Sequence, residues 1–137
     1  MTKLAIDNAL LASLVGEVAP WVSAITGWEL NLTSLRCRAL SKEQGYEEIV
    51  LGRLQGVNID EWKELMPDFL ERLIETMVEE NALAAYMPGA GEILVIRENV
   101  DDSNLEGLKL VLAHELTHRA QHMAHGRLFV RLDQLLW

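Results

Sequence analysis

The sequence contains little of several features that mark specialised classes of protein. It has one cysteine, so it cannot form an intramolecular disulfide, and a disulfide-stabilised secreted scaffold is excluded. Its 12 Lys and Arg are outnumbered by 21 Asp and Glu, which gives a formal net charge of −9. Because phosphate binding requires clustered basic side chains and no basic stripe is visible, we expect no nucleic-acid-binding surface.

Long apolar runs are also scarce. We find no segment that approaches the ~20 uninterrupted apolar residues of a membrane span. Asp7, Asn8 and Glu17 interrupt the N-terminal region, so we expect a helix there rather than a signal peptide, and no membrane partner. A cytoplasmic location is the default expectation. Cys37 is expected to be a small buried residue of a strand, not a catalytic thiol.

The remaining composition is that of a globular domain. Of the 137 residues, 50% are hydrophobic and 24% are charged. This length suits one domain with a core of its own, so we expect a single domain over residues 1–137. Its N-terminal part, about 1–81, is expected to hold helices and strands, and its second part, about 82–137, to bind a metal. Self-association into a homo-oligomer is compatible with the acidic, half-hydrophobic chain.

Three stretches of the N-terminal part show helical spacing of apolar residues. The first covers about 4–25 and is expected to bend at Pro20. The second runs from a capping box at Ser41 to Leu54. The third covers about 58–78, has an acidic outer face and is expected to bend at Pro67.

Other stretches show the alternation typical of strands. Alternation from Trp28 to Ala39 slips by one residue at Ser34, which predicts one strand with a bulge or bend, or two short strands. Residues 84–87 and 92–96 flank the turn sequence Pro-Gly-Ala-Gly and predict a hairpin. We therefore expect an α+β fold: N-terminal helices and a small antiparallel sheet packed on one further helix.

That further helix contains the most informative stretch, His114-Glu115-Leu116-Thr117-His118, which is the HExxH pattern. A capping box formed by Ser103 and Glu106 predicts where the helix begins. An apolar stripe predicts its core-facing side, and the stripe consists of Leu105, Leu108, Leu112 and Leu116. The helix is expected to run to His125 and to end at Gly126, with a short final helix after it.

The spacing within the pattern has a chemical meaning. Residues four apart lie on one face of a helix, so His114 and His118 can bind the same metal ion. Glu115 borders that site, where a carboxylate can accept a proton from a metal-activated water. The alternative is that these are ordinary helix-surface side chains. Tyr86 is a further candidate, as a donor to the oxyanion, although its place in a strand favours an ordinary half-buried tyrosine.

With these residues, the chain resembles the zincin metallopeptidases, and its size is similar to that of the minimal gluzincins, or minigluzincins. The resemblance covers residues 84 to 125: the strand Glu92–Ile96, a short acidic connection and the helix with the HExxH pattern. In that family such a strand borders the cleft and pairs with extended substrate. The resemblance implies a zincin-like fold and a zinc-dependent metallopeptidase of peptide or protein substrates. It assigns zinc binding to His114 and His118 and the role of general base to Glu115, with one zinc per chain, or another divalent ion.

The third metal ligand departs from the family patterns. Gluzincins take it from a downstream glutamate, and no glutamate follows Glu115 in this sequence. Gln121 and Ala124 occupy the positions where metzincins have glycine and histidine. Asp133, the only downstream carboxylate side chain, is the predicted third ligand if the chain reverses at Gly126. His122 lies ~12 Å along a regular helix from His114, which is too far for one ion. The ligand could also come from His125, from an upstream carboxylate (Glu98, Asp101 or Asp102) or from another subunit.

Two further functions remain compatible with the sequence. The first is a non-catalytic, metal-stabilised binding or assembly module, which a closed four-ligand site would favour. The second has no metal, and His114 and His118 are then hydrogen-bonded in or near the core.

Overall fold

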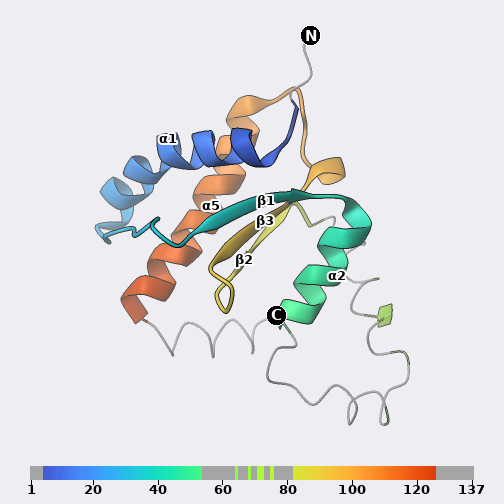
Figure 1. The fold of residues 1–137 in the computed structure, drawn as a ribbon. Helices are drawn as coiled ribbons and strands as arrows, with labels where there is room; N and C mark the ends of the chain where they lie inside the picture. Colours follow the sequence, from blue (N-terminus) through green and yellow to red (C-terminus); the bar gives the residue numbers. More distant parts are fainter. Residues whose placement is uncertain are drawn as a thin grey trace.

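The computed structural model of the protein describes residues 5–53 and 82–125, and between them only residues 64, 68, 71, 72 and 75. The described elements, shown in Figure 1, are the helices α1 (Asn8–Thr26), α2 (Lys42–Arg53) and α5 (Leu105–His125), the strands β1 (Arg36–Leu40), β2 (Ala84–Met87) and β3 (Glu92–Ile96), and the 3₁₀ helix η1 (Arg97–Asn99). The α+β class is therefore confirmed. Of the helix expected over 58–78, the structure describes only residues 64, 68, 71, 72 and 75, and the final helix expected after Gly126 lies outside the described residues.

The three strands form one mixed sheet in the order β1-β3-β2. β2 is antiparallel to β3, as expected for a hairpin, and Gly91 in the connecting turn has the positive φ of 64° that favours glycine. β1 is parallel to β3, with Cys37 beside Ile93 and Ala39 beside Val95. The expected antiparallel sheet is thus wrong for β1. The chain between β1 and β3 passes through α2 and a long connection, which is the length that a parallel pairing requires.

Helices cover both faces of this sheet. α1 and α5 lie against one face, and α2 lies against the other (Figure 1). Ile93 and Val95 of β3 belong to the core under α1 and α5, whereas Leu94 and Ile96 belong to the core under α2. All five residues of β3 are buried. This double burial explains why the strand is nearly continuously apolar rather than alternating.

Helix α1 begins later than its apolar spacing suggests. Asp7 caps it by accepting a hydrogen bond from the Leu10 N–H at 2.8 Å, and Gly27 ends it with a left-handed φ of 73°. By length and composition α1 could cross a membrane. This is weak evidence for a membrane span, because core helices of soluble proteins and signal sequences have the same properties. The expectation of no membrane partner therefore stays a prediction. Its buried face packs into the core with α5.

The slip at Ser34 is a tight turn and not a bulge in a long strand. Residues 28–32 form no regular strand, and the Leu35 N–H donates to the Leu32 carbonyl at 3.1 Å around the turn. Leu30 and Leu32 still pack against the core, which accounts for the alternation in the sequence. Alternation therefore records which side chains face inward but does not require a pairing partner.

Candidate metal centre

Helix α5 holds the HExxH pattern near its middle. Leu108, Leu112 and Leu116 are fully buried against the sheet and α1, as the apolar stripe predicts. The first residue of the stripe, Leu105, is only partly buried. These contacts fix the rotation of the helix about its axis and therefore the direction in which the motif residues face.

The cap of α5 is Asn104 rather than the expected Ser103. The Asn104 side-chain oxygen accepts from the Gly107 N–H at 2.9 Å, and its carbonyl accepts from the Leu108 N–H. The Ser103 hydroxyl and N–H instead donate to Asp101, and these two bonds lower the pKa of the Asp101 carboxyl. Both residues suit a cap, and the turn at Asp101 decides between them.

The two motif histidines meet on one face of α5. Their Nε2 atoms are 3.3 Å apart, and the rings are perpendicular with centroids 4.8 Å apart. Two nitrogens that each lie about 2.0–2.1 Å from a tetrahedral zinc ion are separated by about 3.3–3.4 Å. The distance therefore matches that of a pair of zinc ligands.

A neighbouring side chain orients one of these rings. His118 Nδ1 lies 3.1 Å from Gln121 Oε1, an oxygen that can only accept a hydrogen bond. The proton of the neutral ring is then on Nδ1, and Nε2 presents a lone pair on the side of His114. Gln121 thus supplies the kind of outer contact that holds a metal-binding histidine in the required tautomer.

The three motif residues differ in their exposure. His114 is exposed and His118 is half-buried, whereas Glu115 is only 7% exposed. The histidine pair is therefore accessible from solvent, and the carboxylate lies on the more protected side, about 100° around the helix from His114.

The described residues provide no third ligand. Within residues 5–53 and 82–125, no group of three His, Cys, Asp or Glu side chains is placed to hold a metal ion. Three of the candidates have partners elsewhere: Glu98 accepts from the Lys42 N–H, Asp101 from Ser103, and the His125 ring packs edge-on to Trp28. Asp133, the predicted third ligand, lies outside the described residues, so its assignment stays a prediction.

Tyr86 and His122 form a contact that the sequence did not predict. The Tyr86 side chain is 2% exposed, and its hydroxyl lies 2.7 Å from His122 Nδ1. It also accepts a hydrogen bond from Arg119 Nη1 at 3.0 Å. Tyr86 is therefore fully buried rather than half-buried, and its hydroxyl is engaged with α5 rather than directed to substrate.

Arg119 is the residue that sequence reasoning missed. It is 4% exposed and donates to the Asn31 carbonyl, the Ser34 hydroxyl and the Tyr86 hydroxyl. The sequence did contain a signal for it. Position 119 lies seven residues after Leu112, on the buried stripe, where an apolar residue is expected. A cation there predicts a buried polar network.

Strand β3 does not border the candidate site in the way the resemblance implies. It is the central strand, paired on both sides by β1 and β2. In the described part of the chain, β1 and β2 are the two edge strands and each pairs with β3; β2 packs against α5, whereas β1 packs against α1.

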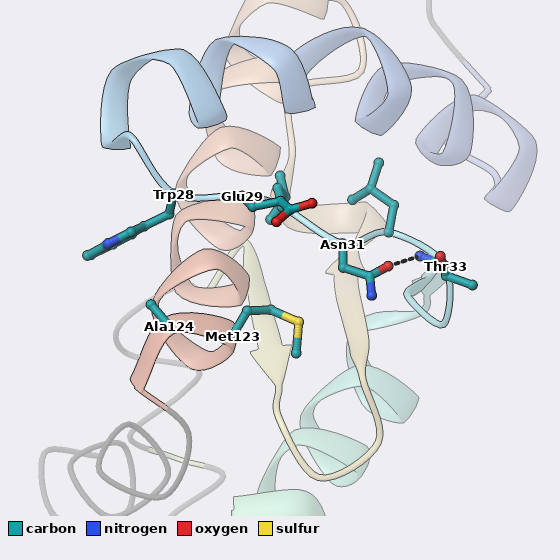
Figure 2. Close-up of a pocket in the computed structure, with 8 residues that line it drawn as sticks. Trp28, Glu29, Asn31, Thr33, Met123 and Ala124 are labelled. Carbon is teal, nitrogen blue, oxygen red and sulfur yellow. Dashed lines mark hydrogen bonds between the residues drawn. The ribbon is translucent and has the colours of Figure 1, made fainter.

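A cleft of about 810 Å³ lies near the C-terminal end of α5. Met123 and Ala124 line one side and residues 28–33 line the other, as Figure 2 shows. The Asn31 side chain accepts a hydrogen bond from the Thr33 N–H at 2.9 Å and stiffens this segment. The motif residues His114, Glu115 and His118 do not line this cleft, so it is separate from the candidate metal centre.

Comparison of the chain with protein-family models, with curated proteins and with solved structures finds no match.

Proposed function

We propose that the protein is a zinc-dependent peptide hydrolase of the zincin type. The observation that carries the proposal is the 3.3 Å separation of His114 Nε2 and His118 Nε2 on one face of α5, with Glu115 between them in the sequence. Two imidazole nitrogens at this distance, with one ring held in the metal-binding tautomer, suit a zinc ion.

Each motif residue has a distinct role in this proposal. His114 and His118 would hold the zinc ion, with Asp133 as the proposed third ligand. When bound, zinc lowers the pKa of a water molecule toward ~7 and polarises a carbonyl group. The Glu115 carboxylate accepts the proton of the attacking water and passes it to the amine that leaves.

The edge strand suggests a peptide as the substrate. The backbone of an edge strand can pair with an extended chain, and such pairing gives affinity without requiring a particular side chain. β2 combines an edge position with contact to α5. We therefore assign to β2 the substrate-pairing role that the resemblance had placed on residues 92–96.

The first experiment is elemental analysis of the purified protein, with matched variants. We expect about one zinc per chain in the wild type and in Glu115→Gln, because that variant keeps both ligands. His114→Ala and His118→Ala should lose the zinc, and His122→Ala should keep it. Asp133→Ala tests the third ligand. A wild type that binds no zinc even after zinc is added would overturn the proposal.

The second experiment tests catalysis with unfolded casein as the substrate. The zinc-loaded wild type should cleave it, and Glu115→Gln should be slower by about 10²–10⁴-fold at unchanged zinc content. Equal rates for the two proteins would exclude Glu115 as general base. Zinc binding without cleavage of casein or of a peptide library would favour the non-catalytic, metal-stabilised module.

A further inference from the structure

The cleft near the C-terminal end of α5 has one wall that is built like the edge of a sheet. Along residues 28–32 the exposure of the side chains alternates: Glu29 and Asn31 are exposed, whereas Trp28, Leu30 and Leu32 are partly buried. This alternation is typical of an extended chain with one face toward the core. Figure 2 shows the segment across the cleft from Met123 and Ala124.

The backbone of this wall has hydrogen-bonding groups without partners. Among the residues that the structure describes, no hydrogen bond engages the N–H or C=O groups of Glu29 or Leu30, whereas the Asn31 carbonyl accepts from Arg119. Neighbouring residues of an extended chain point their backbone groups to opposite edges, so both edges of the segment retain unpaired groups. Such groups are a template for pairing with another extended chain.

Glu29 gives the cleft a negative charge. Its side chain is exposed, and in the described part of the chain it forms no ion pair. The other residues that line the cleft are uncharged, and the whole chain has a formal net charge of −9. A ligand with a Lys or Arg side chain would therefore complement the charge of this cleft.

The rest of the lining suits apolar side chains. Met123 is 45% exposed on the wall opposite residues 28–33, and a flexible thioether adapts to different apolar partners. Leu30 and Leu32 line the cleft from the other side while they pack against the core. The volume of about 810 Å³ lies within the range of about 300–1,000 Å³ that is usual for ligand sites.

We propose that this cleft binds an extended peptide segment with a Lys or Arg between apolar residues, and that the segment pairs with the backbone of residues 29–32 as an added strand. Directly opposite side chains of two paired strands lie on the same face, so the basic residue lies opposite Glu29. Its two neighbours then turn toward the apolar lining around Met123. The inference is independent of the proposed function, since His114, Glu115 and His118 do not line the cleft.

Binding is tested with the peptide acetyl-Val-Lys-Val-Lys-Val-Thr-amide and the isotope-labelled full chain. We expect saturable binding with a Kd below about 1 mM, and the same Kd in the presence of EDTA. The largest amide shifts in nitrogen–proton NMR spectra should fall on residues 29–33 and 123–124. The absence of saturable binding would overturn the proposal. So would shifts confined to β2, which would place the peptide at the strand assigned to substrate under the proposed function.

A reversal of charge tests the role of Glu29. Glu29→Lys should weaken binding of the lysine peptide by about five- to tenfold, and should bind a matched peptide with Glu at both Lys positions more tightly than the wild type does. The control is Glu47→Lys, because Glu47 is an exposed carboxylate of α2, on the other face of the sheet. Both affinities of the control should stay within about twofold of the wild type. Equal effects of the two substitutions would show that net charge alone attracts the peptide.

Backbone pairing is tested with two further versions of the lysine peptide. Each is methylated on the amide nitrogens of alternate residues, and the two versions together cover the whole peptide. Because alternate N–H groups point to opposite edges, only one version should lose affinity, by more than about tenfold. The other should stay within about threefold of the unmethylated peptide. Equal affinities of the two versions would contradict pairing along one edge.

Discussion

Arg119 shows how one buried cation organises several segments of this protein. Its guanidinium group joins α5 to β2 through Tyr86, and to the chain before β1 through Asn31 and Ser34.

We expect Arg119→Ala to lower the free energy of unfolding by about 2–4 kcal/mol, because it removes charged hydrogen bonds and leaves a cavity. Urea denaturation measures this loss. Leu110→Ala is the control on the same helix: Leu110 is 72% exposed, and its change should stay within about 0.5 kcal/mol. Equal effects of the two substitutions would contradict the role of Arg119.

The burial of Cys37 predicts that the free energy of unfolding falls at alkaline pH. Burial raises the pKa of its thiol from 9.0 to about 11. Well below pH 9 the thiol is neutral in the folded and unfolded chains, so it does not oppose folding. As the pH rises from about 9 to 11, the unfolded chain loses its proton first, so stability falls, by at most about 2 kcal/mol. Urea midpoints across this range should fall more steeply for the wild type than for Cys37→Ala. An equal fall of the urea midpoint in the two proteins would show that folding does not keep the Cys37 thiol neutral.

At the scale of elements, a network of ion pairs connects β1, β3 and α2. Glu92 is 6% exposed and pairs with Arg36 and Arg38, and Arg38 also pairs with Glu48. Desolvation alone would lower the pKa of Arg38, but its hydrogen bonds to Glu92 and Glu48 outweigh that effect and raise it.

Removing the central carboxylate should therefore weaken the sheet. We expect Glu92→Gln to lower the free energy of unfolding by about 1–3 kcal/mol, less than for a fully buried pair because Arg36 is largely exposed. The matched control is Glu106→Gln, whose carboxylate is exposed and pairs with Lys109 within α5. That control should change stability by less than about 0.5 kcal/mol in the same denaturation assay. A loss as small as the control's would mean that the network contributes little.

The elements also show what the sequence can and cannot predict. Helix α5 and the β2–β3 hairpin follow from apolar spacing and turn residues, which act over a few positions. The parallel pairing of β1 with β3 does not, because a strand's period says nothing about its partner. Likewise, Asn104 and Ser103 suit a helix cap equally well, and only the contacts of Asp101 decide between them.

In the candidate site, too, the sequence predicts some contacts and not others. The approach of His114 to His118 follows from their spacing on a helix, so the sequence predicts it. The contact of Tyr86 with His122 joins residues 36 positions apart and depends on how the hairpin packs on α5. Long-range contacts of this kind are not visible in local patterns, and the contact proposed between a third ligand and the histidine pair would be of the same kind.

For the whole molecule, zinc binding and folding should be coupled. The Nε2 atoms of His114 and His118 lie 3.3 Å apart only when α5 is folded, so under the proposed function zinc should bind the folded chain more tightly than the unfolded one. Free zinc at about 100 times its Kd adds about 2.7 kcal/mol, which for a domain of this size raises Tm by about 5–10 °C. Differential scanning calorimetry with increasing zinc, followed by a chelator, measures the shift and its reversal. Magnesium should have no effect, because it prefers oxygen ligands to imidazole. The double variant His114→Ala/His118→Ala should keep its zinc-free Tm at every zinc concentration. A wild-type Tm that does not respond to zinc, or a double variant that responds equally, would contradict zinc binding by the HExxH pair.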